Sequence, residues 1–463
     1  MTPSKNILIA YYGDDFTGST DALEILSKSG IKTALFIEPP IPEQLARYPD
    51  IRAFGIAGMT RAMTPDVMEK TLKPAFEVLK DSGAGHIHYK VCSTFDSSPE
   101  VGSIGHAVDI GAEIFKSGFI SLVVAAPNLG RYCAFGNLFA RMGIGSQGQI
   151  HRLDRHPSMS KHPVTPSDES DLRLHLRKQT AKKCDLIDIL EIDKPFSETK
   201  KTLEYKVDQG AEIVLFDAIY PEQMASIGRL IDTYGDNKTP HFSVGSSGIE
   251  MALGDFWAQT ETIKPITLWP DPGIASPLLV VSGSCSPVTA GQIEWAIQNG
   301  FEEVFLHTEA IASQEELYSL EKEIEAATNF IQNNKSVIIH TSKGVNDPRF
   351  ARTAEILQKK GLNKSEIQTC TSRLYGKALG QIINAVIAKN PVRRVVIAGG
   401  DTSSFVARTV GIEAVEMISP VTPGAPLCRA HAPGYPINGR EVVFKGGQVG
   451  GEDYFGVILR GKL

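Results

Sequence analysis

The chain has 463 residues, of which 42% are hydrophobic, and its 47 Lys+Arg against 53 Asp+Glu give a formal net charge of −6. This length favours two domains, and the ordinary apolar and charged content excludes a disordered or fibrous chain. The mild acidity excludes nucleic acid as the main partner, because binding a phosphate backbone needs a basic surplus. No apolar run is long enough for a membrane helix, so no membrane partner is expected. The six cysteines are scattered without a C-x-x-C pair, which favours a reducing, cytoplasmic location.

Short β-branched runs alternate with amphipathic stretches through the first half of the chain. Several runs are continuously apolar, as expected for strands of a parallel sheet that is covered on both faces. The predicted strands are 6–12, 31–37, 51–57, 86–91, 120–126 and 212–217, and the predicted helices are 19–29, 65–81, 104–116, 197–209 and 221–234. A segment rich in Pro, Ser, His and Asp at 158–171 is predicted to be a long loop.

A segment at 264–277 contains four prolines and no helical period, so it is the predicted domain linker. The alternation then restarts, with predicted strands at 278–282, 303–307, 336–340, 395–398 and 441–444, and helices at 287–299, 313–333 and 371–390. We therefore expect two α/β domains with mostly parallel sheets, at 1–263 and 278–463, joined by the linker.

Two adjacent carboxylates, Asp14 and Asp15, follow the first predicted strand. Ligands of open α/β sheets gather at the carboxyl ends of the strands, where a carboxylate can serve as a general base or as a ligand of Mg²⁺ or a hydroxyl group. The alternative is a turn with a helix N-cap, a role that suits Asp equally well.

A cation and several hydroxyl groups follow another predicted strand, in the segment KVCSTFDSS at 90–98. This chemistry fits a small, oxygen-rich anionic ligand. Arg61 follows the strand at 51–57 and could supply a second cation at the same sheet edge. The alternative is a polar surface loop. The candidate substrate residues are Arg61, Lys90, Ser93, Thr94 and Asp96.

Three turns of small residues follow predicted strands in the second half. Each can offer backbone N–H groups to an anion, and together they predict a cradle for nucleotide phosphates. The alternative for each is a tight structural turn. The candidate residues are Ser282, Ser284, Gly399, Gly400, Asp401, Thr402, Gly446, Gly447 and Gly450.

The sequence resembles the four-carbon acid-sugar kinases, a family that includes D-threonate, D-erythronate and 3-oxo-tetronate kinases. The resemblance covers nearly the whole chain. In the first half it rests on GDDFTGSTDALE (13–24), TRAMTP (60–65), YKVCSTFDSSPEVGSIG (89–105) and HPVTPSDESDL (162–172). In the second half it rests on SGSCSPVTAGQI (282–293), AGGDTSS (398–404) and PGAPLC (423–428).

The resemblance implies an N-terminal sugar-acid-binding domain, a C-terminal ATP-binding domain and an active site in the interdomain cleft. It implies phosphorylation of a terminal hydroxyl with ATP and Mg²⁺, with Asp14 or Asp15 as the base. Such a protein could assemble as a homodimer. The alternative is a sugar-acid sensor of the same shape without turnover.

The sequence departs from the family pattern at Asp401, where Glu is common, at the KGGQVGG loop (445–451), where the family has a KSGNFG-like loop, and at Leu427. These departures suggest a divergent subgroup, for which a branched or 3-oxo substrate such as 3-oxo-isoapionate joins the four-carbon acids as a candidate.

Overall fold

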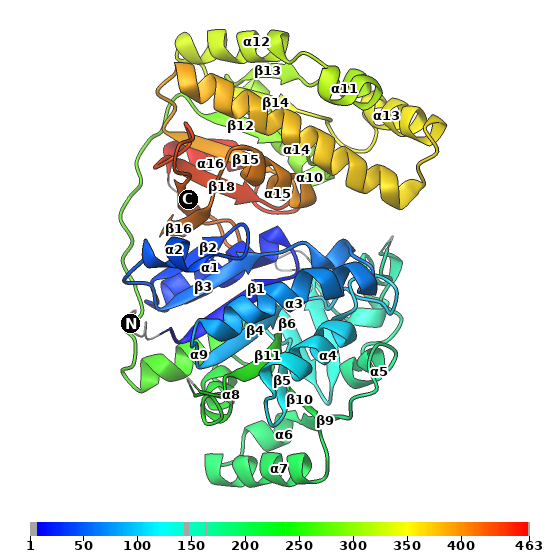
Figure 1. Ribbon diagram of the computed structural model, residues 1–463, viewed down its shortest axis with the longest axis vertical. Coiled ribbons are helices and arrows are strands. Elements are labelled where there is room, and N and C mark those ends of the chain that lie inside the picture. The colour runs from blue at the N-terminus through cyan, green and yellow to red at the C-terminus, as the bar shows by residue number, and fades with distance from the viewer. Residues whose placement is uncertain (1–6, 143–147, 163, 237, 462–463) are drawn as a thin grey trace. The chain divides into compact units, whose positions relative to one another are not determined.

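The computed structural model describes residues 7–142, 148–162, 164–236 and 238–461. Residue 6 of the first predicted strand and residue 163 of the predicted loop lie outside these ranges. The chain divides into two compact units, Met1–Thr267 and Leu268–Leu463. Each contains a mostly parallel sheet flanked by helices (Figure 1), which confirms the predicted α/β class. Within the described ranges, no helix is long and apolar enough to cross a membrane.

The N-terminal unit is built on eight parallel strands. In spatial order these are β2 (Thr33–Phe36), β3 (Ala53–Ala57), β1 (Ile9–Gly13), β4 (His86–Lys90), β11 (His241–Gly245), β5 (Ile120–Val123), β10 (Ile213–Phe216) and β9 (Cys184–Ile187). Because neighbouring strands run in the same direction, the residues that follow β1, β3, β4 and β11 emerge at one edge of the sheet.

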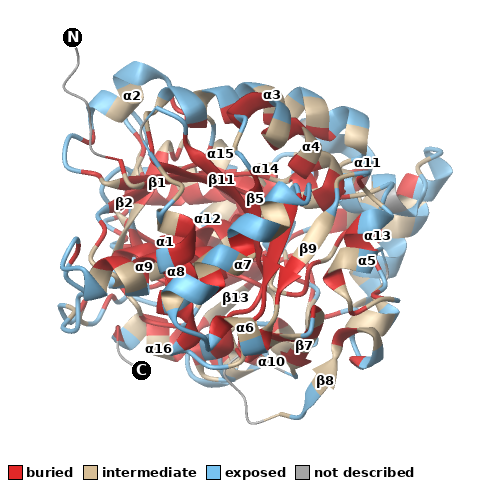
Figure 2. Ribbon diagram, turned by 90° about the horizontal axis from the view of Figure 1, so that it is seen from below, coloured by how far each residue is buried: buried red, intermediate tan, exposed pale blue. Residues whose placement is uncertain are grey.

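Two layers of helices cover this sheet. Helices α1 (Phe16–Lys28), α8 (Gln223–Asp232) and α9 (Gly248–Gln259) pack together on one face, and α3 (Pro65–Asp81) and α4 (Ile104–Phe115) pack together on the other. Helix α3 has the predicted bounds, because its buried residues recur every three or four positions. Figure 2 shows the resulting pattern, with buried strands and helices exposed on their outer sides.

The remaining helices and strands of this unit are short, apart from α7, which has 13 residues. They are α2 (Pro42–Ala46), α5 (Leu172–Arg177), α6 (Ile189–Ile192), α7 (Phe196–Asp208) and an antiparallel sheet of β6 (Arg131–Ala134), β7 (Asn137–Arg141) and β8 (Ile150–Arg152). Strands β6 to β9 and β11 and helix α9 were not predicted from the sequence.

The C-terminal unit has a seven-stranded sheet with five parallel strands and an antiparallel edge. In order these are β13 (Glu302–Phe305), β14 (Val337–His340), β12 (Leu279–Ser282), β15 (Arg394–Ala398), β18 (Glu441–Lys445), β17 (Leu427–His431) and β16 (Ala414–Ser419). Helices α10 (Pro287–Gln298) and α16 (Tyr454–Arg460) cover one face, and α12 (Glu321–Gln332), α14 (Lys364–Lys389) and α15 (Gly400–Thr409) the other (Figure 1).

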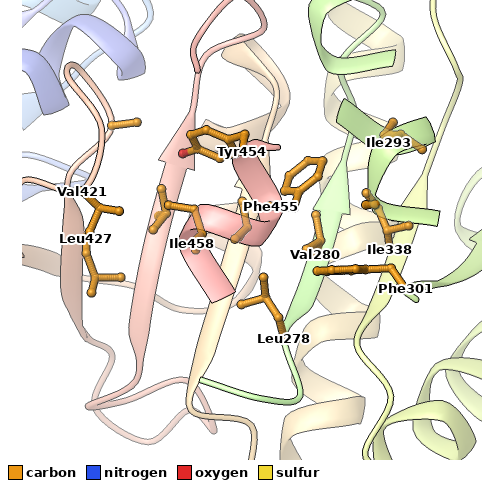
Figure 3. Close-up of a cluster of buried hydrophobic side chains, with 14 residues drawn as sticks. Leu278, Val280, Ile293, Phe301, Ile338, Val421, Leu427, Tyr454, Phe455 and Ile458 are labelled. Carbon is orange, nitrogen blue, oxygen red and sulfur yellow. The ribbon is translucent and has the colours of Figure 1, made fainter. Parts of the chain in front are cut away.

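The hydrophobic core under α10 and α16 holds this sheet in place. Phe455 of α16 and Ile293 of α10 lie over Val280 and Ile338, which project from neighbouring strands (Figure 3). All four side chains are fully buried. Burying a side chain of this size contributes about 1.5–3 kcal/mol, so the turns at the strand ends rest on a rigid base.

The helix predicted at 313–333 is confirmed over Glu321–Gln332 but is wrong in its first part, where the chain breaks between two helices. The structure has α11 (Thr308–Gln314), a short turn at Glu315–Leu317, and then α12. Glu315 adopts a left-handed backbone with φ 53°, which ends α11. Helix α13 (Pro348–Lys359) was not predicted, and the helix predicted at 371–390 begins earlier, as α14.

Candidate functional site

In the N-terminal unit, Asp14 and Asp15 share one guanidinium group. Arg61 Nη2 lies 2.9 Å from Asp14 Oδ1 and 3.0 Å from Asp15 Oδ1, and Arg61 Nε donates to Asp14 Oδ2 at 3.3 Å. The backbone supports this geometry, since the Asp14 N–H donates to the carbonyl of Lys90 at 2.8 Å and the Arg61 N–H donates to the carbonyl of Asp14 at 3.0 Å. Both oxygens of Asp14 are therefore held by Arg61.

Asp15 has a second role and a free oxygen. It is the N-cap of α1, and its Oδ1 accepts a hydrogen bond from the Gly18 N–H at 2.8 Å. No described residue donates a hydrogen bond to its Oδ2, and the side chain is 20% exposed, against 3% for Asp14. Asp15 can therefore fill both roles that were considered from the sequence, that of a helix cap and that of a candidate base.

Lys90 lies beside the same helix terminus, where an added Cβ on Gly18 would meet both Asp15 Oδ1 and Lys90 Nζ. Its Nζ is 3.8 Å from Asp21 Oδ2, and an added Cβ on Gly18 would come within 2.8 Å of that Nζ. Glycine at position 18 therefore lets the N-terminus of α1 approach the lysine closely. Asp21, one helical turn beyond Thr17, was not among the predicted site residues.

The cations at this edge of the sheet are paired with acidic side chains, so the edge is not a simple cationic pocket. Burial raises the pKa values of Asp14 and Asp21, while Arg61 and Lys90 respectively oppose the shift. Burial alone would lower the pKa of Lys90, but the carboxylates of Asp21, Asp15 and Asp14 outweigh it and the net shift is upward. Both cations are thus held in their charged forms by neighbouring acids.

The segment after β4 carries the polar residues that the sequence offered as candidate substrate ligands. Thr94 is buried, Ser93 and Asp96 are partly exposed, and Asp96 Oδ1 is buried with no hydrogen-bond partner among the described residues. Phe95 between them has a left-handed backbone, with φ 57°. A small cavity lined by Thr94 and Asp96 opens here, closed on its other side by part of the predicted loop, including Thr165. Strained backbone and an unpaired polar atom are both typical of ligand sites.

In the C-terminal unit, the predicted small-residue turns contact one another. An added Cβ on Gly283, after β12, would lie 2.4 Å from Thr402 Cγ2, after β15. The Gly399 N–H donates to the carbonyl of Lys445, at the end of β18, at 2.9 Å. A Cβ on Gly447 would lie 3.1 Å from Ser284 Oγ. The three turns therefore form one surface at the carboxyl ends of β12, β15 and β18.

Local geometry explains why small residues occupy these positions. Gly399 has φ 133°, a region that disfavours side chains, and Gly400 begins α15. Ser282 Oγ accepts from the Ser284 N–H at 3.4 Å. The remaining predicted residues are Asp401, which is exposed in the first turn of α15, the buried Gly446, and Gly450, with φ 85°.

Some features of both units escaped the sequence analysis. The turn Ser246–Ser247–Gly248 after β11 has the same strand, small-residue turn and helix pattern as the turns recognised in the second half, so the signal was available. Arg131 is a buried cation whose Nε has no partner within the described ranges. No group of three or more His, Cys, Asp or Glu side chains in the described part of the chain could hold a metal ion.

Comparisons with known proteins also distinguish the two halves of the chain. The family models for a sugar-binding N-terminal domain and a nucleotide-binding C-terminal domain match residues 9–253 and 279–455. The chain is 40% identical over 464 residues to the 3-oxo-isoapionate kinase of Paraburkholderia graminis, covering 99% of this chain and 95% of that protein. It is 27% identical to the 3-oxo-tetronate kinase of Methylobacterium radiotolerans, with 98% and 99% covered.

Solved structures show the same fold. A Salmonella typhimurium LT2 protein superposes with a TM-score of 0.73 at 24% identity, covering 98% of each chain. A Haemophilus influenzae protein superposes with a TM-score of 0.68 at 22% identity, covering 97% of this chain and 98% of the other.

Proposed function

The chain belongs to the four-carbon acid-sugar kinase family, and from that premise we propose that it phosphorylates a primary hydroxyl of a short 3-oxo sugar acid. The sugar-acid kinase activity follows from the family. The substrate is the proposed part. The 40% identity over 99% of the chain favours a substrate of the 3-oxo-isoapionate type over the 3-oxo-tetronate type, for which the identity is 27%.

We assign the base to Asp15. A general base must reach the proton that it removes, and Asp15 Oδ2 is the one oxygen of the two carboxylates that accepts no hydrogen bond from a described residue. Asp14, buried and held at both oxygens, instead fixes the orientation of Arg61. In this arrangement Asp15 Oδ2 takes the proton of the substrate hydroxyl.

The substrate's other groups have complementary partners nearby. Lys90 and the remaining N–H groups of Arg61 can bind the carboxylate, because charge-assisted hydrogen bonds favour anionic oxygens. Ser93, Thr94 and Asp96 supply hydroxyl and carboxylate groups for the sugar hydroxyls. The unpaired Asp96 Oδ1 supports this role, because a substrate O–H would satisfy it.

The surface formed by the turns of the C-terminal unit suits ATP, which when bound supplies the phosphoryl group. Glycine fits these positions because added Cβ atoms on Gly283 or Gly447 would crowd the neighbouring turn, so glycine lets the turns pack into one surface of backbone groups. Ser282, Ser284, Gly399–Thr402, Gly446, Gly447 and Gly450 would hold it. We propose that Mg²⁺ enters as its complex with ATP, whose phosphate oxygens and waters are the ligands it prefers.

A screen of ADP release tests this function. The purified chain is incubated with Mg·ATP and a panel of four- and five-carbon aldonates, their 3-oxo forms and 3-oxo-isoapionate. We expect the highest kcat/KM with a 3-oxo acid. No ADP release above background with any acid, together with binding of an acid in a thermal-shift assay, would identify a sensor without turnover instead.

A further inference from the structure

The loop after β18, residues 446–451, has nearly all its carbonyl oxygens turned toward the protein interior. Lys445 Nζ donates to the carbonyl of Gly446 at 2.9 Å. The hydroxyl of Thr289 donates to the carbonyl of Gly447 at 2.9 Å. Gln292 Nε2 faces three further carbonyls, those of Val449 at 3.0 Å, Gly450 at 3.1 Å and Gly451 at 2.8 Å.

These three side chains form one connected set, which we name the loop anchor (Lys445, Thr289 and Gln292). Lys445 Nζ also donates to Thr289 Oγ1 at 2.9 Å, and the same hydroxyl donates in turn to the loop carbonyl of Gly447. Both Thr289 and Gln292 lie on α10 and are fully buried, and Lys445 is 1% exposed. No carboxylate within the described ranges forms an ion pair with Lys445, so its hydrogen bonds to these oxygens are what satisfies it.

The position of the carbonyls determines where the amides point. In a trans peptide the C=O and the following N–H point in opposite directions. Inward carbonyls at 446, 447, 449, 450 and 451 therefore direct the N–H groups of residues 447, 448, 450, 451 and 452 outward. None of these five N–H groups has a backbone acceptor among the described residues, and residues 448, 450, 451 and 452 are exposed. Several N–H groups on one exposed loop make an anion-binding surface.

We propose that Lys445, Thr289 and Gln292 are positioning residues that aim the backbone amides of residues 447, 448, 450, 451 and 452 at the phosphates of the nucleotide. This inference rests on the proposed function, and it explains how the loop serves it. The loop lies at the same surface as the other turns, because Gly447 packs against Ser284 and the Gly399 N–H binds the carbonyl of Lys445. Lys445 stands in the KGGQVGG turn considered from the sequence, but none of the three residues was among the candidate residues for this site.

The test uses substitutions that remove a donor with little change in size. Thr289→Val and Gln292→Met are compared with the wild-type chain by calorimetric titration with Mg·ADP and, separately, with tripolyphosphate, which carries phosphates but no base. We expect both affinities to fall about tenfold, which corresponds to about 1.4 kcal/mol. In steady-state assays the KM for ATP rises by the same factor, while the KM for the sugar acid stays within about twofold.

Two control variants separate positioning from general damage. Thr289→Ser keeps the hydroxyl and should recover most of the affinity that Thr289→Val loses. Gln298→Met makes the same chemical change as Gln292→Met at an exposed position of α10 and should change nothing. If Thr289→Val does not fold, judged by circular dichroism, Lys445→Met takes its place.

The outcomes are distinct. Unchanged affinity for tripolyphosphate in folded Thr289→Val and Gln292→Met overturns the inference, as does equal loss in Thr289→Ser and Thr289→Val. A wild-type chain that binds neither Mg·ADP nor Mg·ATP overturns the proposed function itself. A wild-type chain that binds nucleotide and turns over, with variants of normal affinity, overturns the loop anchor alone.

Discussion

Replacing Asp15 by Asn should remove turnover and leave the fold intact. A positioned general base contributes about 10²–10⁴-fold to a rate, or about 3–5 kcal/mol of the activation barrier. We therefore expect kcat to fall by at least about 100-fold. Asn caps helices as well as Asp does, and Asp15 is 20% exposed, so its stability cost should stay near 1 kcal/mol.

Asp14→Asn is the matched comparison, because it alters the neighbouring carboxylate in a different environment. Asp14 is 3% exposed and both its oxygens bind Arg61. Breaking a buried ion pair costs about 3–5 kcal/mol, reduced here because Asp15 still contacts the guanidinium. We expect about 2–3 kcal/mol of lost stability in urea unfolding, together with a higher KM for the sugar acid.

The assays are coupled ADP release for kcat and KM, urea unfolding for stability, and titration with Mg·ADP, whose affinity should be unchanged in both variants. An Asp15→Asn protein with kcat within about threefold of the wild type would refute the assignment of the base. If Asp14→Asn alone lost turnover without losing stability, the two roles would be exchanged.

Three further predictions concern the C-terminal unit. Gly283→Ala should weaken Mg·ATP binding at least tenfold, because the added Cβ would lie 2.4 Å from a neighbouring side chain. The control Gly291→Ala in α10, whose added Cβ has nothing within 4 Å, should bind Mg·ATP normally. Equal affinities of the two variants in calorimetry would contradict this prediction. Burial lowers the pKa of Lys445 from 10.5 to about 7. Between those pH values the unfolded chain binds more protons than the folded chain, so the stability of the wild type should rise with pH relative to that of Lys445→Met. The rise should be at most about 1.4 kcal/mol per pH unit. A constant difference in unfolding free energy between the two proteins from pH 7 to 9, measured in urea, would disprove this prediction. Glu441→Gln should cost about 3 kcal/mol of unfolding free energy, because it removes the negative charge 2.7 Å from the fully buried Arg394, whose other partners are neutral backbone carbonyls. A loss below about 1 kcal/mol would count against that pair.

Much of the N-terminal site could be predicted because parallel topology brings strand ends together. Asp14, Arg61 and Lys90 lie at or just after the carboxyl ends of three neighbouring strands, β1, β3 and β4, so their convergence required only the correct assignment of strands. The pairing of Arg61 with both carboxylates could not be read from the sequence, because it depends on rotamers and on the turn at Thr60–Ala62. Because rotamers are not visible in the sequence, it also did not show that the cations expected to bind the substrate anion are paired with acidic side chains.

Asp21 illustrates a second limit. Its approach to Lys90 depends on the rotation of α1 and on the close contact that Gly18 permits. The break between α11 and α12 is a third case, since the polar run from 313 to 333 keeps a helical period while Glu315 leaves the helical region. Local pattern does not report such a backbone change.

The residues that support the nucleotide turns lie far apart in sequence. Lys445 and Thr289 are 156 positions apart, and Gln292 reaches carbonyls 157 to 159 positions away. Glycines mark a turn because of a local backbone requirement. A polar side chain that fixes the turn from a neighbouring helix has no local signature, so only tertiary structure reveals it.

Phosphorus NMR of the reaction products tests the central claim most directly. The wild-type chain is mixed with Mg·ATP and 3-oxo-isoapionate, and in parallel with a 3-oxo-tetronate, and the phosphorus signals are followed as ATP is consumed. A sugar-acid kinase predicts one phosphate monoester per ADP, with coupling to the protons of a primary carbon, and little inorganic phosphate. Consumption of ATP to inorganic phosphate alone, or no consumption with either acid, would contradict the account.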